Sequence, residues 1–547
     1  MEFNLADLFE SVVDQIGGQT AMVSGSRRLT YTELDRRANR LAHHLDGAGV
    51  GPRDTVGLQL VNGTEYIESM LACFKIRAVP INVNYRYLAG ELEYLYRDAA
   101  LVGLIFHDRF APAVKGALNA MPKTRTVLEV CEPVGPQPTV GENYESALAS
   151  APDTREFPPR HSDDLYCVYT GGTTGMPKGV LWRHDDIFFA AMGGGDPLSL
   201  GNHIATPGEL ATRLLHPGIT ALAVAPFMHA AGHWLAFSTL FGGGTVVTTG
   251  GGVFDATEVW RLVETERVNA IAVVGDAMVR PLLDVLAAQP DRYDLSSLMA
   301  VGSGGAVLSP STKAQLAELL PGRIVADRFG SSETGQIGGE MPPEDPFGPP
   351  RLRVDERTDV LDADLQPVPP GSGVIGNLAR GGHVPIGYLG DPPGSAATFV
   401  EARGQRWALP GDLATVNADG SIVVLGRGSL CINTGGEKVF PDEVEAALKD
   451  DPDVRDAIVV AAPDARFGER VVALVLPRSG HEIDPEAIRQ HVHARLSGFK
   501  VPREVIVVDD FVRSPSGKPD YPWARAVAEA ALRDQNEDSS TRIEETD

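Results

Sequence analysis

Apolar positions in the first 160 residues repeat with the periods of helices and strands. Between Leu29 and Leu45 they recur near the 3.6-residue period of an α-helix, which predicts an amphipathic helix there. Apolar runs at 55–60 and 78–84 predict strands, with a further helix expected around 66–76. Alternating helices and strands favour a mostly parallel sheet covered by helices. We therefore expect the chain to begin with an α/β unit.

The same kind of pattern continues through the middle of the chain. Apolar and aromatic residues at 165–169 and 180–182 predict two strands joined by a glycine-rich loop. A strand followed by a helix is expected at 268–283, and another pair from residue 301 onward. Beyond residue 410, short apolar runs alternate with turn residues, which is typical of antiparallel β structure. The last part of the chain is expected to form a small α+β domain.

Composition excludes several classes of function. The chain has 547 residues, enough for about three to four compact units. With 48 basic and 73 acidic residues its net charge is −25, which argues against general binding to nucleic acid or to anionic membranes. Its four cysteines are too sparse for a disulfide framework and lack metal-ligand spacing. The acidic N-terminus has no signal-peptide pattern, and the most apolar run, 219–228, is short, so we expect a cytoplasmic protein with no integral membrane segment.

The loop between residues 169 and 180 carries the strongest chemical signal. Its glycines let backbone N–H groups converge on an anion, while its threonines and its lysine add hydroxyl donors and a positive charge. The residues predicted to bind a polyphosphate are Thr170, Gly171, Gly172, Thr173, Thr174, Gly175 and Lys178. Pro177 precedes the lysine and a strand follows it, so this is not the nucleotide loop of the G-x-x-x-x-G-K-[ST] type. A flexible surface loop is the alternative interpretation.

This string, YTGGTTGMPKGV, resembles the phosphate loop of the adenylate-forming superfamily, which includes acyl- and aryl-CoA synthetases, peptide-synthetase adenylation domains and beetle luciferase. Gly171 stands where serine is usual, which removes one hydroxyl donor and leaves the backbone donors. The resemblance extends, with motifs in the family's order, from the helix near Thr32 to Lys518. It implies that the cofactors are ATP and Mg²⁺, with CoA as a substrate.

Three further segments resemble the nucleotide site of this family. The resemblance implies that Gly304, Gly305 and Ala306 lie against the adenine, and that Asp412 and Arg427 hold the ribose. The segment DRFGSSETG supplies the remaining ATP-binding residues Arg328, Phe329, Gly330, Ser331 and Ser332. Phe329 and Ser332 replace the usual tyrosine and threonine, and Glu333, together with Thr174, is implied as a Mg²⁺ ligand. A helix N-cap is the alternative interpretation of Ser331 or Ser332.

The acid site is implied by a proline–x–x–His–x–x–Gly motif that begins at Pro226. Its implied acid-binding residues are His229, Ala230, Ala231, Gly232 and Gly304. A histidine in an apolar run is more often a hydrogen-bonded core residue, and this interpretation is kept for His233. For Asp276, the helix N-cap is the favoured interpretation.

The resemblance also implies the fold class and the domain organisation. The fold is α/β, with a large multi-subdomain N-terminal region, residues 1–427, that consists of two α/β subdomains plus a β-barrel-like part. A small mobile α+β domain, 428–533, would pivot at Gly428–Ser429, where Asp or Lys is usual. The acidic tail, 534–547, is expected to be disordered.

The residues implied for catalysis and CoA binding lie largely in the small domain. The implied CoA-binding residues are Gly435, Gly436 and Glu437, and the catalytic set is Lys518, His229 and Glu333. The predicted activity is that of an ATP-dependent acyl-CoA synthetase for a bulky hydrophobic acid, polycyclic or long-chain, similar to actinobacterial enzymes for steroid or terpenoid acids. An enzyme that loads a carrier protein, an inactive nucleotide-binding module and a homodimeric assembly all stay open.

Overall fold

The computed structural model describes residues 1–544 except for nine short segments. These are residues 132–137, 171–175, 197–200, 251–253, 307, 341–350, 435–436, 465 and 514–518. For Glu340 and for residues 534–544 it describes the backbone alone.

The first α/β unit has a five-stranded sheet in the order β4-β3-β5-β6-β7, and every pair in it is parallel, as expected. Helix α2 (Tyr31–Gly47) begins at a capping box, in which the side chains of Thr30 and Glu33 each accept from the other's backbone N–H. The strands are β3 (Thr55–Gln59), β4 (Val79–Asn82), β5 (Gly103–His107), β6 (Thr126–Val130) and β7 (Glu142–Asn143). The other helices are α1 (Leu5–Ile16), α3 (Thr64–Lys75), α4 (Ala89–Asp98), η1 (Asp108–Phe110), α5 (Ala111–Ala117), η2 (Leu118–Ala120) and α6 (Tyr144–Ala149).

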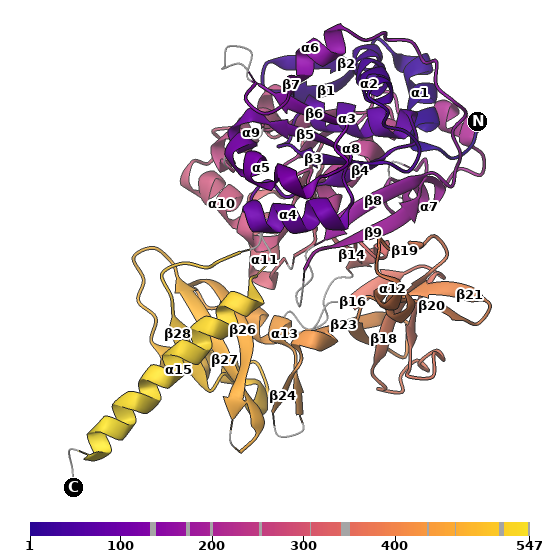
Figure 1. Ribbon diagram of the computed structural model, residues 1–547. Coiled ribbons are helices and arrows are strands. Elements are labelled where there is room, and N and C mark those ends of the chain that lie inside the picture. Colours follow the sequence, from indigo (N-terminus) through magenta and orange to yellow (C-terminus); the bar gives the residue numbers. More distant parts are fainter. Residues whose placement is uncertain are drawn as a thin grey trace.

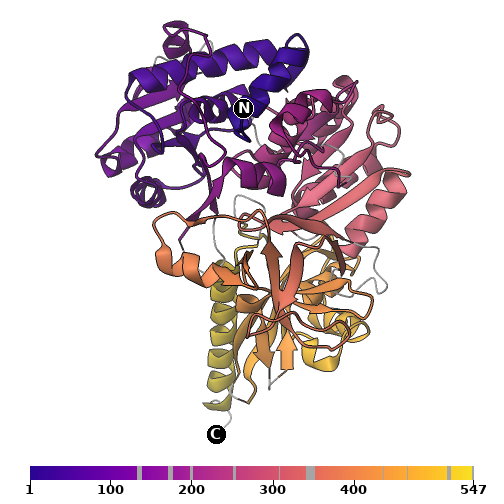
Figure 2. The same ribbon diagram turned by 90° about the vertical axis from the view of Figure 1, so that its right-hand side faces the viewer.

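A second α/β unit lies beside the first (Figure 2). Its sheet runs β2-β1-β11-β10-β12-β13-β14, and all its pairs are parallel except β1–β2. The strands are β1 (Thr20–Ser24), β2 (Arg27–Thr30), β10 (Thr220–Ala223), β11 (Thr245–Thr248), β12 (Ala270–Val273), β13 (Ala300–Gly304) and β14 (Ile324–Ser331). The helices are α7 (His184–Ala191), η3 (Pro207–Thr212), α8 (Ala230–Phe241), α9 (Ala256–Thr265), α10 (Gly275–Ala288) and α11 (Pro310–Leu319).

Strand β14 continues the same sheet into an antiparallel part, as the pattern beyond residue 410 predicts. The sheet runs on through β15-β16-β23-β22-β18-β21-β20, with β17 paired to β18. The strands are β15 (Gly335–Glu340), β16 (Arg351–Val354), β17 (Thr358–Leu361), β18 (Gly376–Gly381), β20 (Phe399–Ala402), β21 (Gln405–Ala408), β22 (Asp412–Val416) and β23 (Ile422–Arg427), with helix α12 (Pro392–Thr398). A separate hairpin of β8 (Leu165–Thr170) and β9 (Lys178–Arg183) pairs with β19 (Gly387–Tyr388).

The C-terminal domain follows the short helix η4 (Gly428–Leu430) and lies below the two α/β units (Figure 1). It is a five-stranded sheet with helices, and hence α+β as predicted. Its elements are β24 (Ile432–Thr434), β25 (Glu437–Val439), α13 (Pro441–Lys449), β26 (Val454–Asp464), β27 (Gly468–Pro477), α14 (Pro485–His493), η5 (Gly498–Lys500), β28 (Glu504–Val507) and α15 (Tyr521–Glu544).

The backbone of the C-terminal tail differs from its prediction. Helix α15 extends to Glu544 and points away from the body of the molecule, whereas the polar, acidic sequence predicts disorder from residue 534 (Figure 1). The first turns of α15 bury Tyr521, Ala524 and Ala528 against the domain core. Once a helix is nucleated in this way, each further residue adds a hydrogen bond at little cost, so polar residues can continue it.

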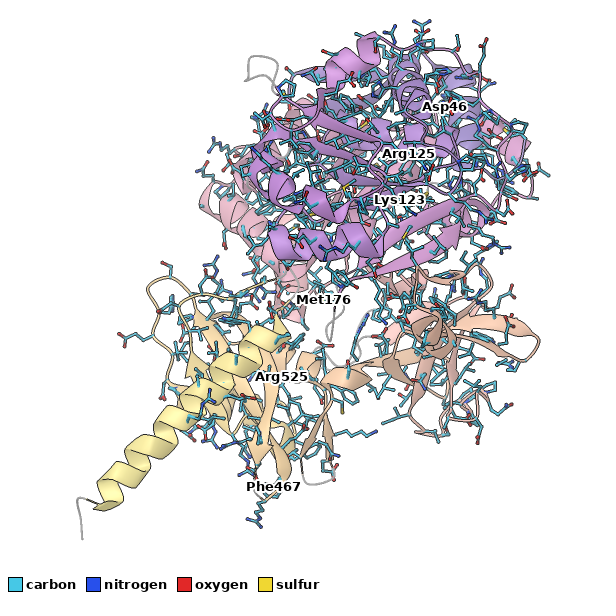
Figure 3. All side chains as sticks on the ribbon, in the orientation of Figure 1. Asp46, Lys123, Arg125, Met176, Phe467 and Arg525 are labelled. Atoms are coloured by element: carbon cyan, nitrogen blue, oxygen red, sulfur yellow. The ribbon has the colours of Figure 1, made fainter. Side chains whose placement is uncertain are left out.

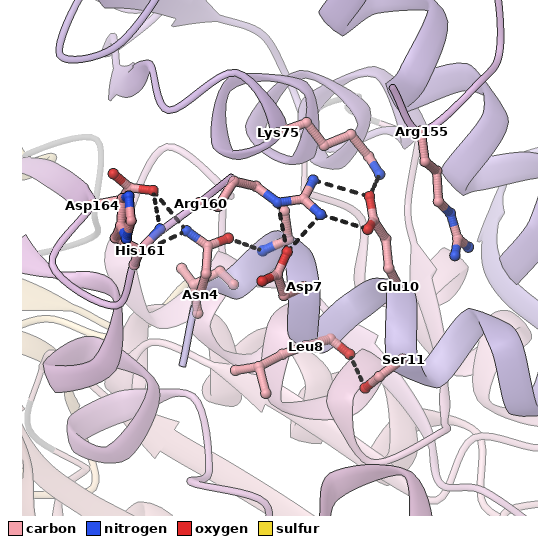
Figure 4. A network of polar contacts seen from close by, with 12 residues as sticks. Asn4, Asp7, Leu8, Glu10, Ser11, Lys75, Arg155, Arg160, His161 and Asp164 are labelled. Carbon is pink, nitrogen blue, oxygen red and sulfur yellow. Dashed lines mark hydrogen bonds and ion pairs between the residues drawn. The ribbon is translucent and has the colours of Figure 1, made fainter. Parts of the chain in front are cut away.

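A buried polar network ties α1 to α2 and α3, and Figure 4 shows its part around Glu10. The ammonium group of Lys75 is fully buried, donates to Glu10, and donates to Asp35 over 2.8 Å. Arg160 forms a bidentate pair with Glu10, at 2.6 and 3.1 Å, and Arg155 donates to Asp35 over 2.8 Å. Burial would raise the pKa of each carboxyl, but the cations together outweigh burial and hold both pKa values below their ordinary range.

Candidate functional site

A cavity of about 1060 Å³ lies where the N-terminal region meets the C-terminal domain. Its wall includes the ends of β8, β13 and β14, the start of α8, and the segment before and at the start of α15. Met176, which follows the glycine-rich loop, lines this cavity and lies between the two parts of the molecule (Figure 3). The carboxyl ends of neighbouring parallel strands therefore meet at one edge, where α/β sheets commonly bind ligands.

The segments expected at the adenine come together in this wall. Strands β13 and β14 are parallel neighbours in which Gly304 lies opposite Arg328, and both residues line the cavity. The other lining residues of this group are Gly305, Phe329, Gly330, Ser331 and Ser332. Ala306 follows Gly305 but does not line the cavity, while Gly305 has a φ of +85°, a conformation that favours glycine.

The turn after β14 holds the carboxylate expected at Mg²⁺. The N–H of Glu333 donates to Ser331 Oγ over 3.2 Å, and the hydroxyl of Tyr388 donates to Glu333 Oε1 over 3.1 Å. Burial and this neighbouring carboxylate raise the pKa of Tyr388. Because β15 follows rather than a helix, the N-cap interpretation of Ser331 and Ser332 is wrong.

The carboxylate of Glu333 is the kind of ligand that Mg²⁺ takes, although Glu333 does not itself line the cavity. Mg²⁺ retains several waters and binds through one or two carboxylates together with substrate phosphates, so a single protein carboxylate suffices. Among the described residues, no cluster of three His, Cys, Asp or Glu side chains could hold a metal by itself. Thr174, the other predicted ligand, lies outside the described residues.

The predicted phosphate loop is described at its two ends only. Gly171, Gly172, Thr173, Thr174 and Gly175 lie outside the described residues, while Thr170 and Lys178 pair across the hairpin of β8 and β9. Thr170 lines the cavity. The ammonium of Lys178 lies 2.7 Å from Asp391 Oδ2, and this hydrogen bond lowers the pKa of Asp391. A phosphate that binds Lys178 would therefore have to replace the half-buried carboxylate of Asp391 as its partner.

The predicted ribose pair lies on two neighbouring strands. Asp412 of β22 is the cross-strand partner of Arg427 of β23, and their side chains form an ion pair at 3.4 Å. Asp412 is buried. Neither residue lines the cavity described above, so the structure brings the pair together but not into that wall.

The predicted acid segment forms the start of α8. His229 is the N-cap residue, and it lines the cavity together with Ala230 and Ala231. Gly232 is buried and does not line the cavity; a side chain there would meet the carbonyl oxygen of Pro226 at 2.5 Å. This glycine therefore lets the helix start pack against the preceding turn.

His233 is a core residue, as predicted. Its Nδ1 lies 2.7 Å from the carbonyl oxygen of Phe227, and its Nε2 contacts the hydroxyl of Tyr166. Burial lowers the pKa of His233 to about 4, so the ring is neutral near pH 7. Trp234, which lines the cavity, donates from Nε1 to the same tyrosine hydroxyl over 2.9 Å.

Asn82 is a cavity residue that the sequence analysis missed. From the end of β4, its side-chain amide donates to the carbonyl oxygens of Tyr169 and Met228, at 2.8 and 2.7 Å. Its side-chain oxygen accepts from the N–H of Tyr169 over 2.6 Å. Asn82 thus links the start of the phosphate loop to the acid segment. The available signal was the amide of Asn82 between the apolar residues Ile81 and Val83 of the predicted strand.

The N-cap interpretation of Asp276 is wrong. Val274 is the N-cap residue of α10, and Asp276 lies inside the first turn. Its carboxylate instead accepts from the N–H of Ser309 over 2.9 Å and lies 3.4 Å from the guanidinium of Arg280. The i,i+4 spacing of Asp276 and Arg280 is visible in the sequence, whereas the contact with Ser309, the N-cap residue of α11, is not.

The C-terminal domain completes the cavity wall. Arg513 and Pro519 form an isolated antiparallel bridge, and both line the cavity. Lys518 lies between them and outside the described residues, as do Gly435 and Gly436. Glu437 begins β25, is exposed, and does not line the cavity. Within the described residues, none of the helices combines the length and apolar character that a membrane crossing requires.

Comparisons with known proteins match the chain over nearly its whole length. The family model "AMP-binding enzyme" matches residues 9–389, and that of the "AMP-binding enzyme C-terminal domain" matches 443–518. A 3-oxocholest-4-en-26-oate–CoA ligase of Rhodococcus rhodochrous is 44% identical, with 96% of each chain covered. A medium/long-chain-fatty-acid–CoA/3-oxocholest-4-en-26-oate–CoA ligase of Mycolicibacterium smegmatis is 43% identical, with 98% of each covered.

The fold agrees with these matches. The crystal structure of ATP-bound MatB from Rhodopseudomonas palustris has a TM-score of 0.80 and 25% sequence identity, and the match covers 96% of this chain and 99% of that one. The predicted fold class and family resemblance are thereby confirmed. The chain belongs to the AMP-binding enzyme family, among its acid–thiol ligases.

Proposed function

We propose that the chain is an ATP-dependent acyl-CoA synthetase that first forms an acyl-AMP, with release of pyrophosphate, and then transfers the acyl group to CoA. The observation that carries the proposal is one cavity whose wall combines the expected adenine segment, the expected acid segment and both residues that flank the lysine loop. A carboxylate resists nucleophiles because it is negative. Joining it to AMP removes that charge and supplies a leaving group.

Small side chains on neighbouring strands support a bulky hydrophobic acid as substrate. Ala221 lies opposite Ala270, which lies opposite Ala300, and all three line the cavity. In the next row on the same face, Ala272 lies opposite Gly302, and both line it too. These rows form a flat apolar wall that would accept a polycyclic or long-chain acid. The names of the steroid-acid and fatty-acid ligases among the relatives support the same class.

The residues of the chain would divide the first half-reaction between them. Thr170 and Lys178 would hold phosphates together with the loop amides, and Glu333 would bind Mg²⁺. When bound, Mg²⁺ acts as a Lewis acid that stabilises negative charge on the phosphate oxygens. Lys518 would donate to the carboxylate and to the α-phosphate, which offsets the repulsion between two anions.

For the second half-reaction, we propose that the domain 428–533 rotates at Gly428–Ser429. This rotation would withdraw Lys518 and bring Gly435, Gly436 and Glu437 to the pantetheine arm of CoA. Arg513 and Pro519 line the cavity, whereas Glu437 does not. This supports the view that the domain orientation in the structure serves the first half-reaction.

A screen of pyrophosphate release over diverse acids tests the activity and its substrate together. We expect release to depend on a steroid-type or long-chain acid, and free CoA to be consumed. Release without CoA consumption, but with acylation of a carrier protein, would favour the carrier-loading alternative. No acid-dependent release with any acid would favour an inactive nucleotide-binding module.

The variant Lys518→Ala tests the assignment of the lysine. Acyl-AMP formation should fall roughly a hundred- to thousandfold, because one preorganised donor to the reacting phosphate is lost. Conversion of synthetic acyl-AMP and CoA to the thioester should stay close to the wild-type rate, since the acyl group is already neutral. Equal losses in both reactions would contradict the proposed domain rotation.

We further propose that the protein works in the cytoplasm, where ATP and CoA are available. Whether it is a homodimer can be decided by size-exclusion chromatography with light scattering. The activity proposed above requires a single chain, because one chain supplies every residue named in it.

A further inference from the structure

Arg280 joins the N-terminal region to the C-terminal domain. It lies on α10, and its guanidinium donates to the carbonyl oxygens of Arg455, at 2.9 Å, and Lys449, at 3.5 Å. Ser311, at the start of α11, donates to the same Lys449 carbonyl over 3.4 Å. Three hydrogen bonds therefore cross between the two parts at this point.

Residues of the N-terminal region hold the side chain of Arg280 in place. Its Nε donates to Thr312 Oγ1 over 3.2 Å and lies 3.4 Å from Asp276 Oδ2. Its side chain is 11% exposed and that of Asp276 is 7% exposed. A buried guanidinium that keeps a carboxylate and several hydrogen-bond partners is fixed in one rotamer, and Asp276 neutralises its charge.

The partner of Arg280 is the end of a helix. Lys449 is the last residue of α13, where backbone carbonyls lack partners within the helix and carry the negative end of its dipole. A cation that donates to these carbonyls stabilises the contact in two ways: it forms hydrogen bonds, and its positive charge interacts favourably with the negative end of the helix dipole. The contact depends on the backbone of α13 and is therefore sensitive to the orientation of the whole domain.

A chain of charged contacts continues from α13 to the lysine loop. The ammonium of Lys449 lies 3.6 Å from Asp456 and 3.9 Å from Glu445, and Asp456 pairs with Arg513. Arg513 stands immediately before the loop 514–518 and lines the cavity. The end of α13 that Arg280 holds is thus linked by side chains to the base of the loop that carries Lys518.

We propose that Arg280, oriented by Asp276, is a positioning residue for acyl-AMP formation: it docks α13, and with it Arg513, the residue before the lysine loop, at the cavity. This inference rests on the proposed function. Arg280 does not line the cavity, so it would act on the orientation of the domain and not on a substrate. A reorientation for the thiol step would have to break its contacts with the two carbonyls.

The test measures the two half-reactions separately. For Arg280→Ala we expect acid-dependent ATP–pyrophosphate exchange to fall roughly ten- to hundredfold, the range for losing hydrogen bonds from a charged group. Conversion of synthetic acyl-AMP and CoA should stay within about twofold of wild type. Ser311→Ala, which removes one weaker crossing hydrogen bond, should give a smaller loss of the same kind. Arg280→Lys keeps a cation and should recover part of the exchange rate.

Arg267→Ala is the matched control. Arg267 also lies in the N-terminal region, but its guanidinium forms an exposed ion pair with Asp294, with 2.8 Å between nitrogen and oxygen. The substitution should change neither half-reaction. Equal loss of both half-reactions in Arg280→Ala and in Ser311→Ala, or no loss in either variant, would overturn the proposal. Lys518→Ala, assayed in parallel, separates the two ideas: if it loses exchange alone while Arg280→Ala loses nothing, the proposed function stands and the positioning role falls.

Discussion

Replacing Lys75 with methionine should destabilise the N-terminal region strongly. Methionine keeps an unbranched side chain that ends at the Cε position of lysine, and it lacks the ammonium group that lies between Glu10 and Asp35. The side chain of Lys75 is 0% exposed, so water cannot replace it as the partner of the two carboxylates. Both carboxylates would keep an arginine partner, Arg160 or Arg155, and this limits the damage.

The expected loss is about 3 kcal/mol of unfolding free energy at pH 7. Removing one partner of a buried pair typically costs about 3–5 kcal/mol, and the remaining arginines favour the lower end. The exposed pair Arg267–Asp294 provides the control, because its side chains are 59% and 53% exposed. Arg267→Ala should cost less than about 1 kcal/mol.

The loss should also depend on pH. Glu10 and Asp35 have folded pKa values below their ordinary 4.5 and 3.8, so they stabilise the wild type above those values. That stability is lost as the pH falls through the folded pKa values. Without Lys75 the pKa values should rise, and the variant should differ most from wild type near neutrality and least in acid.

Urea unfolding, followed by circular dichroism at pH 7 and near pH 3, measures both effects. Glu10→Gln in the Lys75→Met background should recover part of the loss at pH 7, because one of the two carboxylate charges that faced the ammonium disappears. The reasoning would be refuted by a loss below about 1 kcal/mol at pH 7. It would equally be refuted by a loss of the same size at both pH values.

Three further substitutions test the site. Ala231→Trp should exclude large acids and spare short ones in pyrophosphate release; equal loss for both would place Ala231 outside the acid site. Tyr388→Phe removes the donor to Glu333 and should raise the KM for magnesium-ATP roughly tenfold; an equal rise in the KM for the acid would contradict that role. Gly436→Leu should block thioester formation and leave acyl-AMP formation intact, and acyl-CoA at the native rate would rule out the CoA assignment.

Local patterns in the sequence predict local structure well. The 3.6-residue period over 29–45 corresponds to α2, and the strands predicted around the phosphate loop correspond to β8 and β9. Both signals depend on neighbours in the chain, which the sequence displays directly. The helix in the tail was missed because its continuation depends on turns that pack against the domain.

Partners that are distant in the chain could not be predicted in this way. Asp276 accepts from Ser309 at the start of α11, and Asn82 binds two segments from later in the chain. The polar groups of either side chain could instead have formed hydrogen bonds with backbone groups close to them in the chain. Only the packing of α10 on α11, and of β4 beside β8, decides which partner is within reach.

The division of the cavity wall has an evolutionary consequence. The proposed acid side is supplied by the first turn of α8 and by small residues on β10, β12 and the first part of β13, whereas the proposed adenine side is supplied by the end of β13 and by the end of β14. Substitutions on α8, β10 and β12 can therefore accumulate with little effect on the adenine side. Enzymes that share one activation chemistry can therefore come to use different acid substrates through a few substitutions. The steroid-acid and fatty-acid ligases named among the relatives are consistent with such a history.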